Sequence, residues 1–513
     1  MGRIDVSVLS AKSAEGPHAF PGSATSSVGA GVAELVVAFF ALGAISLLLM
    51  TATRRLDLFS HPLWLDETFT SMLANDRGFS HMIRGVKSGV DTNPPTYYLI
   101  LWPLARLFGP IGNAGLRTIS LLWILGGLTA LYATCRFHFS PAATSVAILA
   151  VWAHPLIIDQ AFEARFYAPW FGLTAWFCYL QMTQTEHEST LRKLSRYACG
   201  ILATSIHYFG VISMALIIFG DLAVYRSVRR VIPGLLGFVA VLACLPLLLS
   251  QRAGLSVPTW IDPISLSQIK DEFVAVFGVP SILLVMILAW IARLLGQADT
   301  PHNRAKFTAL IPMSSLLFFP VAIVALSLIL QPSLVLRYLI VAILPLAPML
   351  AALVAGIGRN FMALTVVGLI LAGGASIIGK ANATRGLDHE YAAVTEAIDR
   401  DVPQDAFIVF KRRREMYPVL QLRPELASRS AQLDFGNLDL PGITRMSRFE
   451  RDMGRKVESI YPNRRTADLA MLRQYGRFYV IAPSNEFEEL VLELPGFRVE
   501  DPQTILHRVT VKE

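Results

Sequence analysis

The chain has 513 residues, of which 54% are hydrophobic and only 16% are charged. Soluble globular domains are about 45–50% apolar and about 25% charged, so this composition excludes an ordinary soluble protein. The net charge of +7 does not indicate nucleic-acid binding, because the basic residues cluster between apolar segments, as they do in cytoplasmic loops. The four cysteines have no Cys-x-x-Cys spacing, which argues against zinc or redox chemistry.

The N-terminal segment, residues 1–28, is rich in Ser, Gly and Ala and has no helical periodicity. It is predicted to be a disordered cytoplasmic tail. A cleaved signal peptide fits less well, because its apolar region would come sooner and be shorter. Residues 29–380 are predicted to form a transmembrane module with an outer-face loop at 52–115.

The transmembrane module contains repeated apolar stretches that can cross a bilayer core of about 30 Å. We predict 11 transmembrane helices with the N-terminus inside, at about residues 30–51, 116–136, 142–158, 166–184, 231–250, 273–296, 307–330, 335–356 and 360–379, with a tight pair of short helices in 197–225. The apolar stretch 94–108 is short for a span and suits a helix at the membrane interface. One long tilted helix over 197–225 is the alternative that would move every later loop to the other side.

The last segment, residues 381–513, changes character and is predicted to be an extracytoplasmic α/β domain. An amphipathic period predicts a helix, and short apolar runs after turn residues predict strands. The predicted elements are helices at Glu390–Arg400 and Glu486–Leu494 and strands at Ala406–Phe410, Arg477–Ala482 and Thr504–Val511.

The first candidate for chemistry is the acidic pair Asp66-Glu67, predicted in a polar loop after the first span. The pair could be an ordinary solvated one. However, Trp64, Leu65 and Phe69 would press it against an apolar surface, where a carboxylate can act as a general base toward a hydroxyl.

Two further motifs are predicted on the same outer face. In Asn93-Pro94-Pro95, the prolines favour a helix start with Asn93 as its cap, and an outward helix start can hold an anion. Between two spans lies Glu163-Ala164-Arg165. Its arginine either forms a structural ion pair with the glutamate or recognises a phosphate.

The last two motifs are His207-Tyr208, at the turn of the short helix pair, and Arg337-Tyr338, at the outer start of a span. A histidine in an apolar segment is often structural, yet ionisable residues in membrane segments are functional candidates. Arg337 opposes the charge bias of outer loops. Snorkelling explains its position in part, and pairing with a lipid phosphate explains it better.

In their order and spacing, these segments resemble the GT-C superfamily of membrane glycosyltransferases, over about residues 30–380. The closest likeness is to the bacterial family 39-type branch, with aminoarabinose transferases and protein O-mannosyltransferases as relatives. The matching segments are Trp64-Leu65-Asp66-Glu67, Asn93-Pro94-Pro95-Thr96-Tyr97-Tyr98, Glu163-Ala164-Arg165-Phe166-Tyr167, His207-Tyr208 and Arg337-Tyr338-Leu339.

The resemblance implies a polytopic α-helical GT-C fold and a polyprenyl-phosphate-sugar donor. It implies that Asp66 is the catalytic carboxylate, that Glu67 assists it or orients the acceptor, and that Arg165 and Arg337 hold the donor phosphate. The other residues that it implies in substrate binding are Asn93, Tyr97, Glu163, Tyr167, His207 and Tyr338. Asn93 stands where aminoarabinose transferases have a lysine, and Glu163 stands where some relatives have aspartate. These departures put aminoarabinose transfer in doubt and leave a divalent metal open.

The predicted function is therefore transfer of a sugar to a glycolipid, glycan or protein acceptor at the outer face of the plasma (bacterial inner) membrane. Two alternatives remain, a transporter of lipid-linked sugars and an inactive scaffold. Transporters often carry repeats and midplane sites, whereas these candidates gather at one face. The acidic pair argues against a scaffold.

Overall fold

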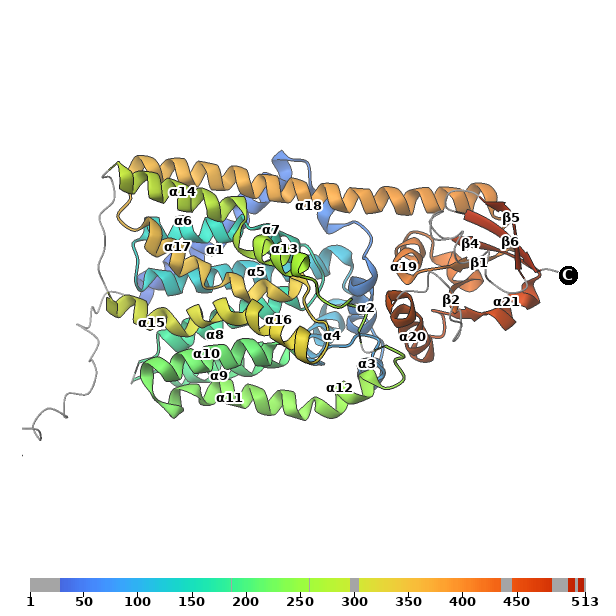
Figure 1. The fold of residues 1–513 in the computed structure, drawn as a ribbon, viewed down its shortest axis with the longest axis horizontal. Helices are drawn as coiled ribbons and strands as arrows, with labels where there is room; N and C mark the ends of the chain where they lie inside the picture. The colour runs from blue at the N-terminus through green and yellow to red at the C-terminus, as the bar shows by residue number, and fades with distance from the viewer. Residues whose placement is uncertain are drawn as a thin grey trace, which may run out of the picture.

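The structure is a computed structural model that describes residues 28–185, 187–257, 259–295, 304–434, 445–481, 497–502 and 506–511. A bundle of helices forms one end of the molecule and a small α/β domain forms the other (Figure 1). The 43-residue helix α18 (Arg359–Asp401) runs along the bundle and reaches the domain. Residues 1–27 of the predicted tail and the predicted helix Glu486–Leu494 lie outside the described residues.

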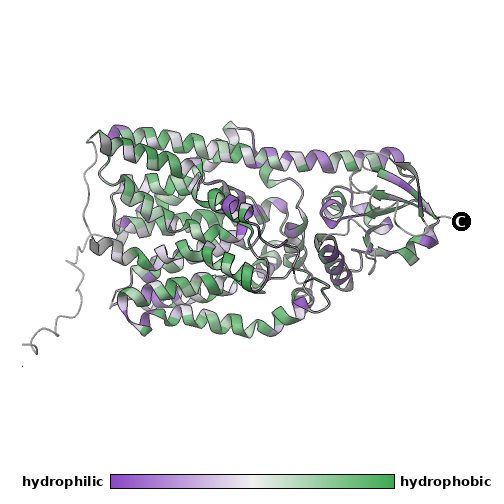
Figure 2. Ribbon diagram, in the orientation of Figure 1, coloured by the Kyte–Doolittle hydropathy of each residue, from purple (hydrophilic) through white to green (hydrophobic). Residues whose placement is uncertain are grey.

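The bundle helices are apolar along most of their length (Figure 2). Their bounds are α1 Val28–Ala52, α5 Asn113–Arg136, α6 Pro141–Trp152, α7 Pro155–Ala161, α8 Tyr167–Met182, α9 Thr190–Ser205, α10 Gly210–Tyr225, α11 Val228–Ala243, α12 Leu245–Arg252, α13 Leu266–Phe277, α14 Pro280–Leu294, α15 Arg304–Ser314, η3 Ser315–Phe318, α16 Phe319–Ile329, η4 Leu336–Ile343 and α17 Leu346–Val354. Long apolar helices of this kind confirm a polytopic membrane protein.

By length and composition, five helical stretches of the described residues can cross a membrane, or up to eight if each of three bent pairs is one span. The predicted total of 11 is reached only if α8, α9 and α10 each cross the membrane as well. Each of these helices has 16 residues, which is about 24 Å of helix and short for a bilayer core. The count of 11 therefore stays a prediction.

The bent pairs correct three predicted spans. The spans at 142–158, 273–296 and 335–356 are broken helices, with bends of 69° between α6 and α7, 61° between α13 and α14, and 46° between η4 and α17. Each break carries a proline, at Pro155, Pro280 and Pro345. Proline has no N–H to continue the helical hydrogen bonds of the preceding turn and clashes with it, so the chain starts a new helix there.

The predicted helix pair in 197–225 is confirmed as α9 and α10, although α9 already begins at Thr190. Gly210 makes the turn between them possible. A Cβ atom at this position would lie 2.5 Å from the carbonyl oxygen of Thr204, so only glycine lets the two helices come this close.

In the C-terminal domain, a six-stranded sheet has the order β3-β2-β1-β4-β6-β5. The strands β3, β2, β1 and β4 run parallel to one another, and β6 is antiparallel to both β4 and β5. The strands are β1 Phe407–Phe410, β2 Ser430–Asp434, β3 Thr466–Asp468, β4 Arg477–Ile481, β5 Phe497–Pro502 and β6 Leu506–Val511. The three predicted strands correspond to β1, β4 and β6. The predicted helix Glu390–Arg400 is the end of α18 and not a separate element.

The domain faces the bundle through two helices that lie between the sheet and the bundle, α19 (Arg413–Leu422) and α20 (Arg445–Ile460) (Figure 1). Their partners are α2 (Leu65–Ala74) and α3 (Phe79–Ser88), which follow the first span. A further short helix, α4 (Thr96–Phe108), packs on α2 and matches the predicted apolar stretch 94–108.

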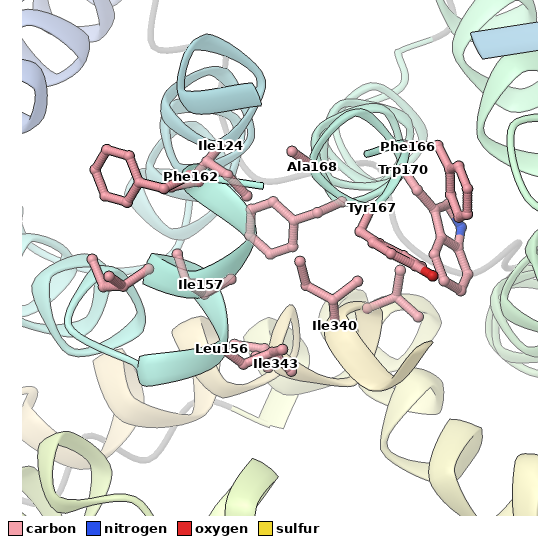
Figure 3. Packing of buried hydrophobic residues seen from close by; sticks show 14 of the residues in the cluster. Ile124, Leu156, Ile157, Phe162, Phe166, Tyr167, Ala168, Trp170, Ile340 and Ile343 are labelled. Carbon is pink, nitrogen blue, oxygen red and sulfur yellow. The ribbon is translucent and has the colours of Figure 1, made fainter. Parts of the chain in front are cut away.

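The core contains a layer of large apolar side chains (Figure 3). Tyr167 lies next to Ile340 of η4, Phe166 and Trp170 lie beside Tyr167, and Phe162 lies at the opposite side of the layer; all five are buried. Shape-complementary packing of this kind holds side chains in single rotamers. It therefore gives Tyr167 a defined position at the edge of the core.

Candidate active site

Asp66 and Glu67 lie in the first turn of α2 and not in a loop as predicted. Acidic residues stabilise a helix start because the N-terminal end carries a partial positive charge. Successive helix residues project about 100° apart. The two carboxylates therefore face different surroundings, although they are neighbours in sequence.

Glu67 faces inward and forms a buried ion pair with Arg117 of α5. Its Oε2 lies 2.6 Å from Arg117 Nη2, and its Oε1 accepts hydrogen bonds from Arg117 Nε at 3.2 Å and from the Ala164 amide at 2.7 Å. The two side chains are only 1% and 0% exposed. Glu67 also accepts a bond from the Trp64 amide at 3.2 Å, so the structure places it away from Asp66 and out of reach of solvent.

Arg165 is also buried, and it pairs with Asp91 rather than with Glu163, the partner in the alternative of a structural ion pair. Arg165 Nη1 lies 2.5 Å from Asp91 Oδ2, and the same nitrogen donates to the Asp66 carbonyl oxygen at 2.8 Å. Burial would raise the pKa of Asp91, but Arg165 and hydrogen bonds from Tyr98 and Asn93 hold it below its usual value. The Arg165 guanidinium therefore fixes the backbone of α2 through the carbonyl oxygen of Asp66.

Asn93 does not cap a helix, contrary to the prediction. Its side-chain amide donates to Asp91 Oδ1 at 2.6 Å, and α4 starts at Thr96 with Pro95 in the cap position. Tyr97 is buried, with its ring edge-on to Phe166 at 6.4 Å. Asn93 and Tyr97 therefore belong to the layer around Arg165 and do not reach the Asp66 carboxylate in the described contacts.

Arg337 of η4 lies beside Asp66, 271 residues away in sequence. Its Nη2 is 3.3 Å from Asp66 Oδ2, and its Nε donates to the Tyr167 hydroxyl at 3.1 Å. The side chains of Arg337 and Asp66 are 20% and 23% exposed. This pair is therefore open to a ligand, unlike the pairs of Glu67 and Asp91.

Aromatic rings surround the guanidinium of Arg337. Its carbon lies 5.3 Å from the ring centre of Trp64, 5.6 Å from that of Trp260 and 5.9 Å from those of Tyr167 and Tyr338. Rings at this distance attract a cation and keep water from its faces. The rings therefore surround the Arg337 guanidinium, while its Nη2 atom points toward Asp66.

His207 lies in the wall behind this pair. Its ring stacks on Phe166 and Trp170, with centroids at 5.0 and 4.8 Å, and lies 5.4 Å from the ring of Tyr338. Its Nδ1 accepts a hydrogen bond from the Phe209 amide at 3.2 Å. His207 thus packs the aromatic wall, and the described contacts give it no bond to Asp66.

Glu163 is buried between α7 and α8. Its Oε2 accepts from Gln160 at 3.0 Å, while Oε1 has no hydrogen-bond partner. Burial raises the pKa of this carboxyl, against the opposing charges of Lys380 and Arg337. Among the residues that the structure describes, no three His, Cys, Asp or Glu side chains gather as metal ligands would.

The predicted residues thus separate into an open group and a buried group. The open group is Asp66, Arg337 and Tyr338, with Tyr167 behind them, and the buried group is Glu67, Asn93, Tyr97, Glu163, Arg165 and His207. Sequence reasoning missed Arg117 and Trp260, and it gave no role to Asp91, which opens the segment that contains Asn93. Arg117 had a usable signal, since an arginine inside an apolar stretch needs a partner.

A scan of family models and a search of curated proteins found no match. Among solved structures, the chain is similar to ArnT from Cupriavidus metallidurans bound to undecaprenyl phosphate, with 14% identity and a TM-score of 0.55 over 95% of this chain and 98% of that one. The apo state of the same protein gives 14% identity and a TM-score of 0.56 over 93% and 98%. The chain has the ArnT fold. ArnT is an aminoarabinose transferase of the GT-C superfamily, so the GT-C fold expected from the sequence motifs is confirmed.

Proposed function

We propose that the chain is a membrane glycosyltransferase that moves a sugar from a polyprenyl-phosphate-linked donor to an acceptor hydroxyl. The observation that carries this proposal is the open pair of Asp66 and Arg337, 3.3 Å apart and enclosed by aromatic rings. The ArnT fold supports it, because one solved ArnT is bound to undecaprenyl phosphate.

The reaction needs one base and one stabiliser of the leaving group. The acceptor oxygen forms a bond to the anomeric carbon of the sugar and gives its proton to Asp66. The bond from that carbon to the phosphate oxygen breaks, and its electrons leave with polyprenyl phosphate. Arg337 is placed to neutralise the growing phosphate charge, because guanidinium pairs with phosphate through directed N–H bonds. A single displacement of this kind inverts the anomeric carbon.

The buried residues have supporting roles in this proposal. Glu67 holds the first turn of α2 through Arg117 instead of touching the acceptor, and Arg165 holds the Asp66 carbonyl instead of the phosphate. Tyr167 orients Arg337 through its hydroxyl. Glu163, whose Oε1 lacks a hydrogen-bond partner, is the buried residue best suited to accept a bond from a substrate hydroxyl.

The site is proposed to face the outside of the plasma membrane, with the C-terminal domain extracytoplasmic. Helix α2, which carries Asp66, lies at the end of the bundle next to this domain (Figure 1), and Arg337 contacts Asp66. A reporter at the C-terminus tests the side. An alkaline phosphatase fusion should be active and a fluorescent protein fusion dark. The opposite pattern would place the site in the cytoplasm.

Transport of a lipid-linked sugar without chemistry is the second candidate, favoured by the three broken helices. Purified protein in proteoliposomes with a panel of polyprenyl-phosphate sugars separates the two. A transferase releases polyprenyl phosphate when an acceptor is added, whereas a transporter moves intact donor between leaflets. Mass spectrometry of envelope glycolipids, glycans and proteins from a deletion strain would then identify the acceptor class.

A further inference from the structure

We propose that Gln421, in the C-terminal domain, is a positioning residue for Asp66, so that this domain is part of the catalytic unit. The proposal rests on the proposed role of Asp66. It concerns the hydrogen bonds between α19 and the chain that enters α2, on both sides of the acidic pair.

Both ends of the Gln421 side-chain amide bind that segment. Oε1 accepts from the Leu63 amide at 2.9 Å, and Nε2 donates to the Leu63 carbonyl at 3.0 Å and to Thr68 Oγ1 at 3.0 Å. Leu63 precedes Asp66 by three residues and Thr68 follows it by two. One side chain of the domain therefore spans the turn that carries Asp66.

Leu63 lies just before the helix, where backbone groups lack the regular hydrogen-bond partners of a helix. Its amide and carbonyl both bond Gln421, and the carbonyl also accepts from Thr68 Oγ1 at 3.3 Å. Loss of the Gln421 amide would leave the Leu63 N–H without this acceptor. The chain would regain freedom in the segment that sets the direction of α2.

A second anchor, Arg117 of the bundle helix α5, holds the same segment from the bundle side. Arg117 donates to the carbonyls of His61 at 2.7 Å and Pro62 at 3.2 Å, while it also pairs with Glu67. The start of α2 is therefore held by hydrogen bonds from two sides, from Arg117 of the bundle and from Gln421 of the C-terminal domain. Removing Gln421 while Arg117 keeps its bonds leaves Asp66 attached but free to shift.

The anchor is rigid because α19 itself is packed. Tyr417, one turn before Gln421, lies edge-on against Phe69 of α2 with ring centroids 5.9 Å apart, and it is fully buried. A shift of about 1 Å in a catalytic group can lower a rate about 100-fold. The contacts of Gln421 with Leu63 and of Tyr417 with Phe69 therefore make the position of Asp66 depend on how the C-terminal domain docks on α2.

The test uses the full chain in nanodiscs with a polyprenyl-phosphate sugar and an acceptor that the wild type uses. Gln421→Ala should lower kcat about 10- to 100-fold and leave the KM for the donor within about twofold. The matched control is Tyr461→Phe, which removes another interdomain bond, from the Tyr461 hydroxyl to Asp76 at 2.7 Å. The control should keep kcat within about twofold.

Gln421→Glu adds a readout that a merely structural role would not move. The carboxylate still accepts from Leu63 N–H but loses both donated bonds. Protonation restores one donor, so its kcat relative to the wild type should rise as the pH falls. Equal kcat losses in Gln421→Ala and Tyr461→Phe, or an unchanged kcat in Gln421→Ala, would overturn the proposal.

Hydrogen–deuterium exchange separates failure of this inference from failure of the proposed function. Gln421→Ala should speed exchange at residues 61–68, and Tyr461→Phe should not. Faster exchange in a protein that transfers no sugar would refute the glycosyltransferase and the catalytic role of Gln421 while leaving the anchor. An active wild type with unchanged exchange in Gln421→Ala would refute the anchor alone.

Discussion

Two parts of the site use the same chemical groups in opposite ways. In the buried part, the Glu67–Arg117 pair is closed, with side chains 1% and 0% exposed. In the open part, the Asp66–Arg337 pair is 23% and 20% exposed and meets aromatic rings rather than further carbonyls. An ion pair whose bonds are all used inside the protein holds the fold. An ion pair with an exposed edge can exchange its partner for a substrate.

The largest expected difference between the two ion pairs is in the stability of a Glu67 variant. Replacement by alanine leaves Arg117 charged and buried without its carboxylate, which destabilises a protein by about 3–5 kcal/mol. Thermal unfolding in detergent should show a much lower midpoint for Glu67→Ala than for Asp66→Ala. Equal midpoints would mean that exposure does not separate the two pairs. A Glu67→Leu, Arg117→Met double variant should recover only part of the loss, because it removes both charges but leaves the Ala164 amide and the His61 carbonyl without these partners.

A third kind of carboxylate sharpens the comparison. Glu415 of α19 is buried, its oxygens accept no hydrogen bond, and Arg414 Nε lies 3.8 Å from its Oε1. Burial raises the pKa of Glu415 to about 7. The folded state therefore holds this proton more tightly than the unfolded chain, so stability falls as the pH rises from about 4.5 through 7.

One pKa unit is worth about 1.4 kcal/mol, which makes this loss roughly 3 kcal/mol at high pH for Glu415. Glu415→Gln should flatten the dependence of the unfolding midpoint on pH over that window. Burial also raises the pKa of Glu450 nearby and lowers that of His61 to about 4, which act on the slope in opposite directions, so the readout is the difference in slope between Glu415→Gln and the wild type. An unchanged slope would show that Glu415 is not the responsible group.

Arg337 gives the next smaller effect. Arg337→Ala should raise the KM for the donor about 10- to 100-fold and change the KM for the acceptor less, because the guanidinium is proposed to face the phosphate. Arg337→Lys should keep part of the affinity, since it retains the charge without the fork geometry. Arg385→Ala is the matched control, because Arg385 pairs with the exposed Asp57 at 3.3 Å. Equal donor KM values in Arg337→Ala and the control would end the phosphate assignment.

Local sequence signals predicted the residues of the site better than their partners. Asp66 was identified by an acidic pair among apolar residues, and Arg337 by a charge on the wrong side of a span. The pairing of Asp91 with Arg165 and of Glu67 with Arg117 depends on how helices cross, which no short motif encodes. Gln421 contacts Leu63 across 358 residues, and nothing in its own neighbourhood indicated that contact.

The fold shows the same division. Apolar length predicted most bundle helices, and the prolines at 155, 280 and 345 were visible markers of the three breaks. The breaks were still missed, because hydropathy over a window of residues does not register direction. The domain boundary that the sequence predicted at residue 380 lies inside α18, because the polar second half of this helix continues as the same helix while it leaves the bundle (Figure 2).

The most direct test of the central claim is the transfer rate of Asp66→Asn against Asp57→Asn. Both variants replace one aspartate by its amide, and Asp57 is exposed in the short helix η2 (Leu56–Phe59), just before α2. With a polyprenyl-phosphate-sugar donor in nanodiscs, Asp66→Asn should lose at least about 100-fold in kcat, since it removes the base, and should keep the wild-type unfolding midpoint and donor binding. Asp57→Asn should turn over normally. Normal turnover by a folded Asp66→Asn protein would contradict the account, because the open pair would then not contain the base.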